Sequence, residues 1–197
     1  MLIDAFVFLL RSIGGLLILL FLARFYLQAL RAPFRHPLGQ FVLALTNWAV
    51  LPARRLLPPL RGYDTASMLL AWLTALLMHL LLLALSPWPF VFTSPLSAVA
   101  LALVAVLELV RMSLYLLFAA VIGQALMSWV APYNPLMPLL DTLTAPFLRP
   151  LRRVIPPVGG VDITPIVLLL AIQLVLSVFI ARLEPAILQY ISIAAPR

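Results

Sequence analysis

Two stretches of this sequence carry the same set of charged and conformationally restricted residues. Residues 53–64 read ARRLLPPLRGYD and residues 151–162 read LRRVIPPVGGVD. Paired guanidinium groups bind phosphate oxygens in a bidentate manner. An aspartate either exchanges protons or accepts hydrogen bonds from the free amides at the start of a helix. The stretches therefore predict contact with a phosphate headgroup or a partner, acid–base work by two carboxylates, or a structural turn.

The predicted contact residues recur in both copies or flank the second one. They are Arg54, Arg55, Gly62, Asp64, Asn134, Arg149, Arg152, Arg153, Gly160 and Asp162. A double proline ends a helix, a glycine opens backbone angles closed to other residues, and an aspartate can cap the next helix. A turn that docks a surface helix and launches a membrane span explains all of these residues, and a binding site can be built from the same turn.

The sequence lacks the residues of the common catalytic and metal sites. It has no cysteine, no Gly-x-Ser-x-Gly elbow, no paired histidines for zinc and no glycine-rich phosphate loop. Asp64 and Asp162 could do acid–base work together, but their places ahead of helices explain them more simply. We therefore expect no enzymatic activity, no cofactor and no metal site.

Charged residues also occur inside the apolar stretches, where they are costly and usually paired or functional. Glu108 and Arg111 stand three residues apart, which predicts an ion pair on one helix face. The alternative places Arg11, Glu108 and Arg111 near the outer headgroups. Arg24 would then reach the inner surface by extending its long side chain.

Two uncharged polar residues stand alone in their apolar stretches. His79 lies in the second stretch and Gln173 in the fourth. A lone histidine is a poor ligand for a metal or a haem, and polar residues at such depths more often bond one helix to another. We expect that role for both residues.

The composition of the chain indicates whether these residues lie in a soluble or a membrane protein. The chain has 197 residues, 65% of them hydrophobic and 10% charged, with a mean hydropathy of +1.17. A soluble domain of this length could not bury so much apolar surface, so the sequence predicts an integral membrane protein. The net charge is +7, and all 13 of the Lys and Arg residues are arginine. This composition suits anionic phospholipid headgroups, but a GC-rich genome also favours arginine codons, and we expect no direct binding of nucleic acid.

Four apolar stretches are long enough to cross the hydrocarbon, which takes about 20 residues. They run over about 3–30, 66–85, 96–130 and 163–183. The third is several turns too long, so it must tilt or project beyond the bilayer. The first could instead be a signal peptide, but its first charge is Asp4 and Arg11 lies where the apolar region should begin. We expect a retained helix.

The chain is an internal duplication. Six residue types of the two stretches recur 98 positions apart, as from Arg54 to Arg152, and upstream Gln28 matches Gln124 at a slightly smaller offset. The repeats are assigned to residues 1–88 and 89–197, each with two spans and one connector. The predicted fold class is an all-α membrane protein in which four transmembrane helices form two parallel tandem repeats.

Charge distribution predicts the orientation. The arginines are concentrated in the two connectors, whereas the loop between the repeats, about 86–95, has no charge. Short cytoplasmic loops carry the excess of Lys and Arg. We therefore expect both connectors in the cytoplasm and both termini outside, in the bacterial plasma (inner) membrane.

Each connector is amphipathic in the pattern of a helix lying among the headgroups. In the second, Leu143 and Phe147 fall on one side, and Thr144 and Arg152 fall on the other. The first connector behaves likewise, with Thr46 and its arginines on the polar side. Because Pro146 and Pro150 each remove a backbone hydrogen bond, we expect two short helices in the second connector, with Pro150 opening the latter one.

The second copy, NPLMPLLDTLTAPFLRPLRRVIPPVGGVDITPIVLLL, with its weaker first copy, resembles the YggT family, also called YlmG-like. The resemblance covers both repeats. The motif is Asn-Pro, Leu-Thr, Pro-x-Arg-Arg-x-x-Pro and Gly-x-Asp before a span. The first copy departs from it with His36 for the asparagine and Ser67 for Pro165. If one copy has relaxed toward scaffolding, it is the first.

The resemblance implies a small bacterial membrane protein with plastid relatives. Family members are linked to osmotic-stress tolerance, cell-division gene neighbourhoods and, in plastids, cytochrome complex maturation. We therefore expect a non-catalytic scaffold or assembly factor for membrane complexes, which binds other membrane proteins or itself. The alternative is an osmotically linked ion or solute channel or transporter, which four spans could form only as an oligomer.

Overall fold

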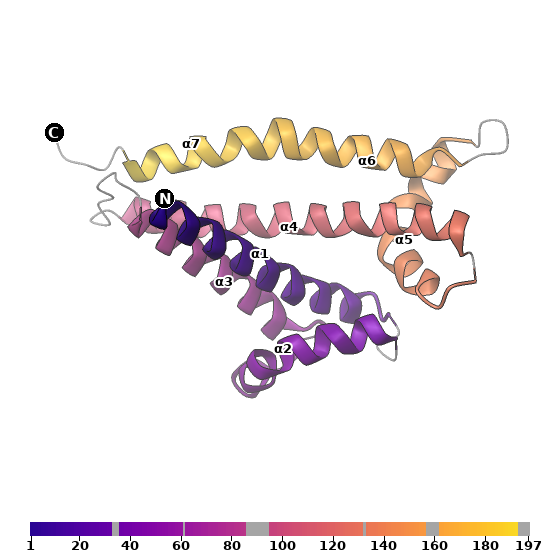
Figure 1. The fold of residues 1–197 in the computed structure, drawn as a ribbon, viewed down its shortest axis with the longest axis horizontal. Helices are drawn as coiled ribbons and strands as arrows, with labels where there is room; N and C mark the ends of the chain where they lie inside the picture. The colour runs from indigo at the N-terminus through magenta and orange to yellow at the C-terminus, as the bar shows by residue number, and fades with distance from the viewer. Residues whose placement is uncertain (33–35, 61, 86–94, 132, 157–161, 193–197) are drawn as a thin grey trace.

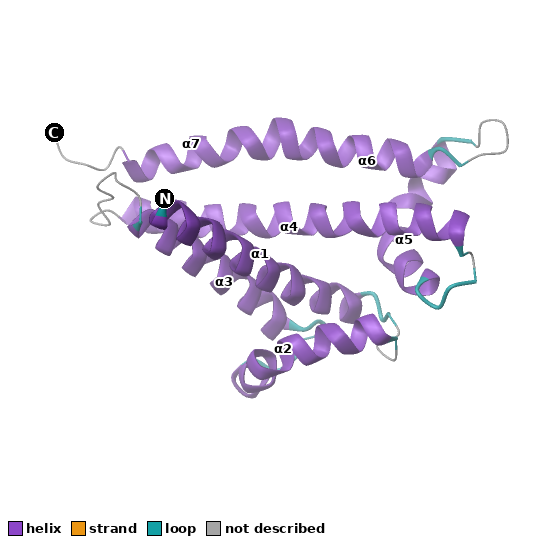
Figure 2. Ribbon diagram, viewed as in Figure 1, coloured by secondary structure: helices purple, strands orange, loops and turns teal. Residues whose placement is uncertain are grey.

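The computed structural model describes residues 1–32, 36–60, 62–85, 95–131, 133–156 and 162–192 as helices joined by short loops (Figures 1 and 2). The helices of the first repeat are α1 (Leu2–Ala29), α2 (Pro37–Leu56) and α3 (Thr65–Ala84). Those of the second are α4 (Pro95–Val130), α5 (Met137–Val154), α6 (Thr164–Leu174), the π-helical segment η1 (Val175–Ile180) and α7 (Ala181–Ser192). The described residues form no named strand, which confirms the all-α prediction.

Four helical segments have the length and apolar composition of membrane spans. They are α1, α3, residues Pro95–Ser128 of α4, and the continuous run Thr164–Leu188 through α6, η1 and α7. The predicted spans are therefore confirmed, with ends within a few residues except at the last, which runs beyond 183. The predicted boundary between the repeats, at residues 88 and 89, lies outside the described residues.

The two repeats run in the same direction. In Figure 1, α1 and α4 both start near the end of the molecule where α7 finishes, and both lead toward the end that holds the connectors α2 and α5. The pair α1 and α3 lies beside the first half of α4 and diverges from it toward the connectors. The two repeats therefore form a wedge. They are in contact at the end of the molecule opposite the connectors, which we call the joined end.

Close packing at one glycine pair holds the joined end together. A Cβ at Gly14 would come within 2.8 Å of the Met78 sulfur on α3, and one at Gly15 within 3.3 Å of the Met112 methyl on α4. Small residues let transmembrane helices approach closely. The main apolar cluster continues from this contact through the buried residues Ile18 and Leu22.

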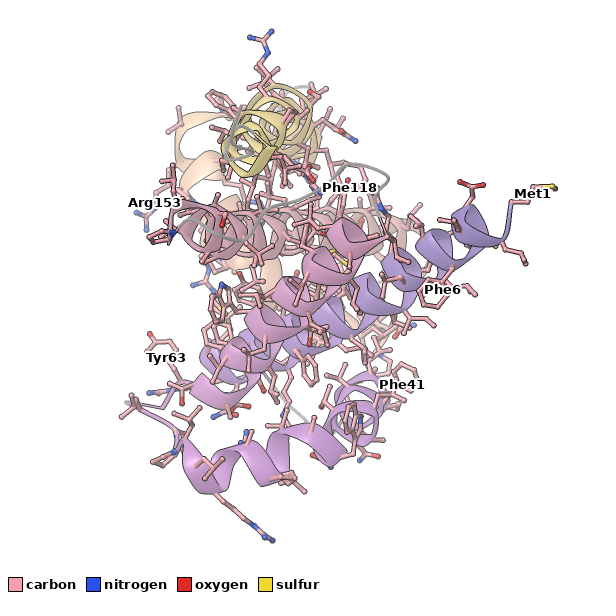
Figure 3. The ribbon with its side chains drawn as sticks, turned by 90° about the vertical axis from the view of Figure 1, so that its left-hand side faces the viewer. Met1, Phe6, Phe41, Tyr63, Phe118 and Arg153 are labelled. Atoms are coloured by element: carbon pink, nitrogen blue, oxygen red, sulfur yellow. The ribbon has the colours of Figure 1, made fainter. Side chains whose placement is uncertain are left out.

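Each connector is one helix, so the predicted division into two short helices at Pro150 is wrong. α5 continues through Pro146 and Pro150, and α2 continues through Pro52. In Figure 1 the first half of α2 lies in the plane of the picture and its second half is seen end-on. In Figure 3, turned by 90°, the first half is seen end-on and the second half lies in the plane, so the helix is bent. Because a proline removes only one or two backbone bonds, it kinks α2 without ending it.

The inward-facing sides of the connectors combine residues from both sides of the amphipathic pattern, since Val42 and Leu139 of the apolar side are buried together with two threonines of the polar side. Thr46 and Thr144, assigned to the polar side, are fully buried against the spans, whereas Phe41 and Phe147 on the apolar side are 56% and 47% exposed. Figure 3 shows Phe41 at the outer edge of α2. The inner face of each connector therefore combines apolar residues with a buried threonine. The exposed phenylalanines of the apolar side can contact lipid or a partner.

The fourth span contains the π-helical segment, which the sequence did not predict. Within it, the Ser177 hydroxyl donates to the carbonyl of Gln173 at 2.7 Å. A π turn is a local widening of an α-helix that often occurs at functional sites.

Candidate functional site

The turn of the first repeat is a buried ion cluster around Asp64. Arg54 donates to both carboxylate oxygens, from Nε to Oδ1 at 3.2 Å and from Nη2 to Oδ2 at 2.7 Å. Arg24 adds a second cation, with its Nε 3.5 Å from Oδ2. The Asp64 side chain, 1% exposed, also accepts the Ser67 hydroxyl at 2.6 Å and the Ser67 amide at 3.4 Å. It therefore caps α3, as the sequence predicts, and neutralises two arginines as well.

Arg24 lies inside the molecule, so the expectation that it extends to the inner surface is wrong. Its side chain is 2% exposed, and Nη1 donates to Thr46 Oγ1 at 2.7 Å and to Asn47 Oδ1 at 2.9 Å. Arg24 lies within two turns of the end of α1, where α2 folds beneath it and supplies both acceptors. Because partners are present at that depth, the side chain has no need to reach water.

Gln28 ties the end of α1 to the same turn. Its Oε1 accepts Arg54 Nη2 at 2.8 Å, and its Nε2 lies 3.5 Å from the carbonyl oxygen of Gly62. Gly62 has φ +88°, a conformation that favours glycine, which confirms the role predicted for it. Three helices of the first repeat therefore meet at one polar network.

The network holds the Asp64 carboxyl in its ionised form. Burial raises its pKa, but hydrogen bonds from Arg54 and Ser67 and the charge of Arg54 outweigh burial, so the pKa lies below its ordinary value. A carboxyl held in this way is a poor general base at neutral pH, because a base works best with a pKa near the operating pH.

The turn of the second repeat keeps the motif but lies open. Arg152 Nε donates to Asp162 Oδ2 at 2.8 Å, and the side chains are 49% and 40% exposed. Asp162 Oδ1 accepts the amide and hydroxyl of Thr164 at 2.9 and 2.5 Å, so it caps α6 as predicted. These Thr164 and Arg152 bonds outweigh the effect of burial and hold the pKa of Asp162 below its ordinary value.

The second repeat has no arginine at the position of Arg24, and a polar cavity lies beside its turn. Ala120, four residues before Gln124, corresponds to Arg24, four residues before Gln28. Thr144 donates to Gln124 Oε1 at 2.6 Å, and Gln124 also bonds Asp141. The cavity beside them has a volume of about 490 Å³. Its charged and polar lining residues are Gln124, Asp141, Thr142, Thr144, Arg149 and Arg152.

The other predicted contact residues have simpler places. Asn134 Oδ1 accepts the Leu136 amide at 2.9 Å ahead of α5, and His36 Nδ1 accepts the Leu38 amide at 3.2 Å ahead of α2. The histidine therefore replaces the asparagine without loss of this bond.

Three arginines of the connector helices α2 and α5 remain unpaired in the part of the chain that the structure describes. They are Arg55, Arg149 and Arg153, and all three are exposed. Figure 3 shows Arg153 at the edge of the second repeat. Gly160 lies outside the described residues.

A second polar group lies in the spans near the joined end. Arg111 Nη1 donates to Glu108 Oε2 at 2.7 Å, which confirms the predicted ion pair, and Arg111 Nη2 bonds Glu184 of α7. A cavity of about 330 Å³ adjoins this pair and reaches Arg11 and His79. Sequence reasoning missed Glu184, although an acidic residue within the last apolar helix was a signal that could have found it.

The two uncharged polar residues behave differently from each other. His79 is buried, and its Nδ1 lies 2.9 Å from the carbonyl oxygen of Ala75 on the same helix. Gln173 is exposed on α6, and its side chain makes no hydrogen bond to another helix within the described residues. Of the two, only His79 adjoins the Arg111 cluster.

Relatives of the chain share its length and organisation. An uncharacterized protein of Pseudomonas aeruginosa is 34% identical over 174 residues, which are 87% of this chain and 86% of the relative. The uncharacterized protein YggT of Escherichia coli is 29% identical over 174 residues, 87% of each chain. A Vibrio alginolyticus protein described as lying in the proC 3' region is 30% identical over 167 residues, 84% of this chain and 88% of its own. No solved structure matches this chain.

The family model described as CCB3/YggT matches twice, over residues 3–85 and 103–183. Each match begins in the first span of a repeat and ends in or just after its last, so it covers the connector and its arginine–aspartate turn. The two-fold match agrees with the duplication seen in the sequence and in the helices. The chain belongs to the CCB3/YggT family.

Proposed function

We propose that the protein is a non-catalytic membrane scaffold, which helps to assemble or organise other membrane proteins through its connectors. The observation that carries the proposal is that the buried charged residues of the described chain, Arg24, Asp64 and Glu108, are all paired internally. Arg24 and Arg54 bind Asp64, and Arg111 binds Glu108 and Glu184. Such pairs hold helices in register, and they leave the exposed faces of α2 and α5 for contacts with other molecules.

The connector faces support this role by their composition. Trp48 is 67% exposed and Leu51 is 53% exposed on α2, beside the exposed Arg55. A surface that combines aromatic and aliphatic side chains with arginine suits the boundary between headgroups and acyl chains. It also suits a partner helix lying in that boundary. Anionic phospholipid and neighbouring membrane proteins, including a second copy of this chain, are the proposed contacts.

The proposed location is the bacterial plasma membrane, with both connectors in the cytoplasm and both termini outside. The excess of arginine in the connectors supports this orientation. Reporters inserted after Gly62 and after Gly160 should both report the cytoplasm, and one after Pro89 should report the outside. Opposite locations for the two glycine sites would contradict the orientation.

A second candidate function is an ion or solute channel or transporter linked to osmotic stress. The cavity beside Glu108, Arg111 and Glu184 favours it, because ionisable groups around a cavity in the spans are a feature of transport pathways. One chain offers only four spans, so this function would require an oligomer.

One pair of experiments separates the two candidates. Purified protein in liposomes should show no more ion or solute flux than empty liposomes. In cells that lack the gene, Trp48→Asp should fail to restore wild-type levels of membrane complexes at equal abundance of the variant. Arg11→Gln, which changes a residue lining the 330 Å³ cavity and leaves the connectors intact, should restore them. Flux that Arg11→Gln abolishes would instead establish the transporter.

A further inference from the structure

The second repeat has a polar cavity and an apolar groove that share part of their lining. The polar cavity, of about 490 Å³, lies between α4 and α5 and is lined by Gln124, Arg149 and Arg152 among others. The groove, of about 210 Å³, lies between α1, α4 and α5. Leu30 and Pro146 line both, so the two spaces adjoin. Two of the helices that line the groove, α1 and α4, diverge toward the connectors (Figure 1).

The two spaces are ordered along α4 as the parts of a lipid are ordered in a bilayer. The polar cavity touches α4 at Gln124, near the connectors, and the groove touches it from Ser113 to Ala120. The distance from Gln124 back to Leu114 is about 15 Å along a helix axis. A molecule with a charged head and a long apolar chain fits this order, with its head on the connector side.

The charges of the polar cavity favour a phosphate. Arg152 is held by Asp162, and Asp141 is bonded by Gln124. Arg149 also lines the cavity, and no carboxylate pairs with it within the described residues. An arginine fork binds phosphate oxygens in a bidentate manner. The corresponding residue of the first repeat is Leu51, so only the second repeat offers this cation.

The first repeat shows why the space is open in the second. There the Arg24 guanidinium fills the interior beside Thr46, whereas the corresponding Ala120 ends at its Cβ, is 5% exposed and lines the apolar groove. The second repeat therefore lacks the side chain that closes the first.

We propose that this crevice binds one phospholipid, with its phosphate on Arg149 and Arg152 and an acyl chain in the groove between α1 and α4. The lipid lies between the two repeats and contacts both through Leu30 and Pro146. The assignment does not depend on the scaffold function, since a channel would carry the same crevice.

The full-length protein, purified in detergent and washed free of loosely bound lipid, tests the proposal by native mass spectrometry. Phosphatidylglycerol should bind at one molecule per chain. Diacylglycerol with the same acyl chains should bind at least about tenfold more weakly, because it has no phosphate for Arg149 and Arg152 to contact. Inorganic phosphate alone should not displace the lipid. Equal binding of diacylglycerol, or displacement by inorganic phosphate, would overturn the proposal.

Three variants locate the site. Arg149→Ala should weaken phosphatidylglycerol by about tenfold. The matched control Arg153→Ala, which removes the same charge from the same helix outside the cavity, should leave binding unchanged. Ala120→Phe should exclude the chain without any change of charge, and circular dichroism establishes that each variant is folded. Equal losses from Arg149→Ala and Arg153→Ala, or full binding by folded Ala120→Phe, would show that the crevice is not the site.

Discussion

The two arginine–aspartate turns share a sequence motif but differ in their surroundings. In the first repeat Asp64 is 1% exposed and binds two arginines, whereas in the second Asp162 is 40% exposed and binds one. The difference comes from a residue outside the motif, because Arg24 of α1 is replaced by Ala120 on α4. A duplicated motif can therefore serve as an internal lock in one copy and remain accessible in the other.

The largest expected effect comes from removal of the buried negative charge. Asp64→Asn leaves Arg24 and Arg54 without a counter-charge and should destabilise the protein by about 3–5 kcal/mol. Asp162→Asn, the matched change at the exposed turn, should cost less than about 1 kcal/mol. Thermal unfolding in detergent measures both, and equal costs would show that the two turns do not differ as described.

Arg24→Met should have a smaller effect, because Asp64 keeps Arg54. The variant leaves Thr46 and Asn47 without their donor, at a cost of about 1–3 kcal/mol, while a repulsion between two arginines is relieved. The reciprocal control is Arg152→Met, which removes an exposed guanidinium and should shift the unfolding temperature only slightly. A larger shift for Arg152→Met would reverse the comparison.

The buried turn should also make stability depend on pH. Because the pKa of Asp64 is lowered in the folded protein, its contribution is fully present above the unfolded value of about 3.9. It is lost as the pH falls through the folded value. The unfolding temperature should therefore drop on acidification below about pH 4, and drop less in Asp64→Asn. An identical pH profile for both proteins would contradict the sign of this shift.

Substitutions in the exposed turn of the second repeat should cost the least stability but impair function the most. Replacement of Arg152, Arg153 and Asp162 by alanine should impair function more than replacement of Arg54, Arg55 and Asp64, when the variants are compared at equal membrane abundance. The exposed turn is the one that another molecule can reach. Growth under osmotic upshift, in cells lacking the native gene, is the readout, and abundance must be measured alongside. If both triple variants lose function only in proportion to their abundance, both turns are structural.

Local pattern was enough to predict the spans, the duplication and both aspartate caps. The spans and the caps depend on residues close together in the chain, such as Asp162 and Thr164, and the duplication is visible as a direct recurrence of residue types. The ion pair of Glu108 and Arg111 also lies within one helix turn. These features were predictable because helix geometry alone brings the partners together.

Tertiary contacts account for what the sequence did not predict. An arginine near the end of a span looks the same whether it extends to the surface or turns inward, and only the fold of α2 beneath Arg24 decides this. Glu184 is 73 residues from Arg111, and no periodicity connects them. The continuity of α5 through Pro146 and Pro150 was missed because the cost of each proline was judged without the packing of Thr144 and Leu148 against the spans.

The π-helical segment in the fourth span sets the rotational register of everything after it. A π turn holds one residue more than the α-helical turn it replaces, so it rotates the following helix by about 100° relative to an unbroken one. Glu184 lies four residues after Ile180, the last residue of that segment, and it faces Arg111 only in the rotated register. Deletion of Ser177 would restore an α-helix and leave Glu184 facing α4, whereas closing the π turn with the residue count unchanged would turn Glu184 away and unpair Arg111 on that side. The charge pairing at the joined end of the molecule therefore depends on the geometry of an uncharged turn.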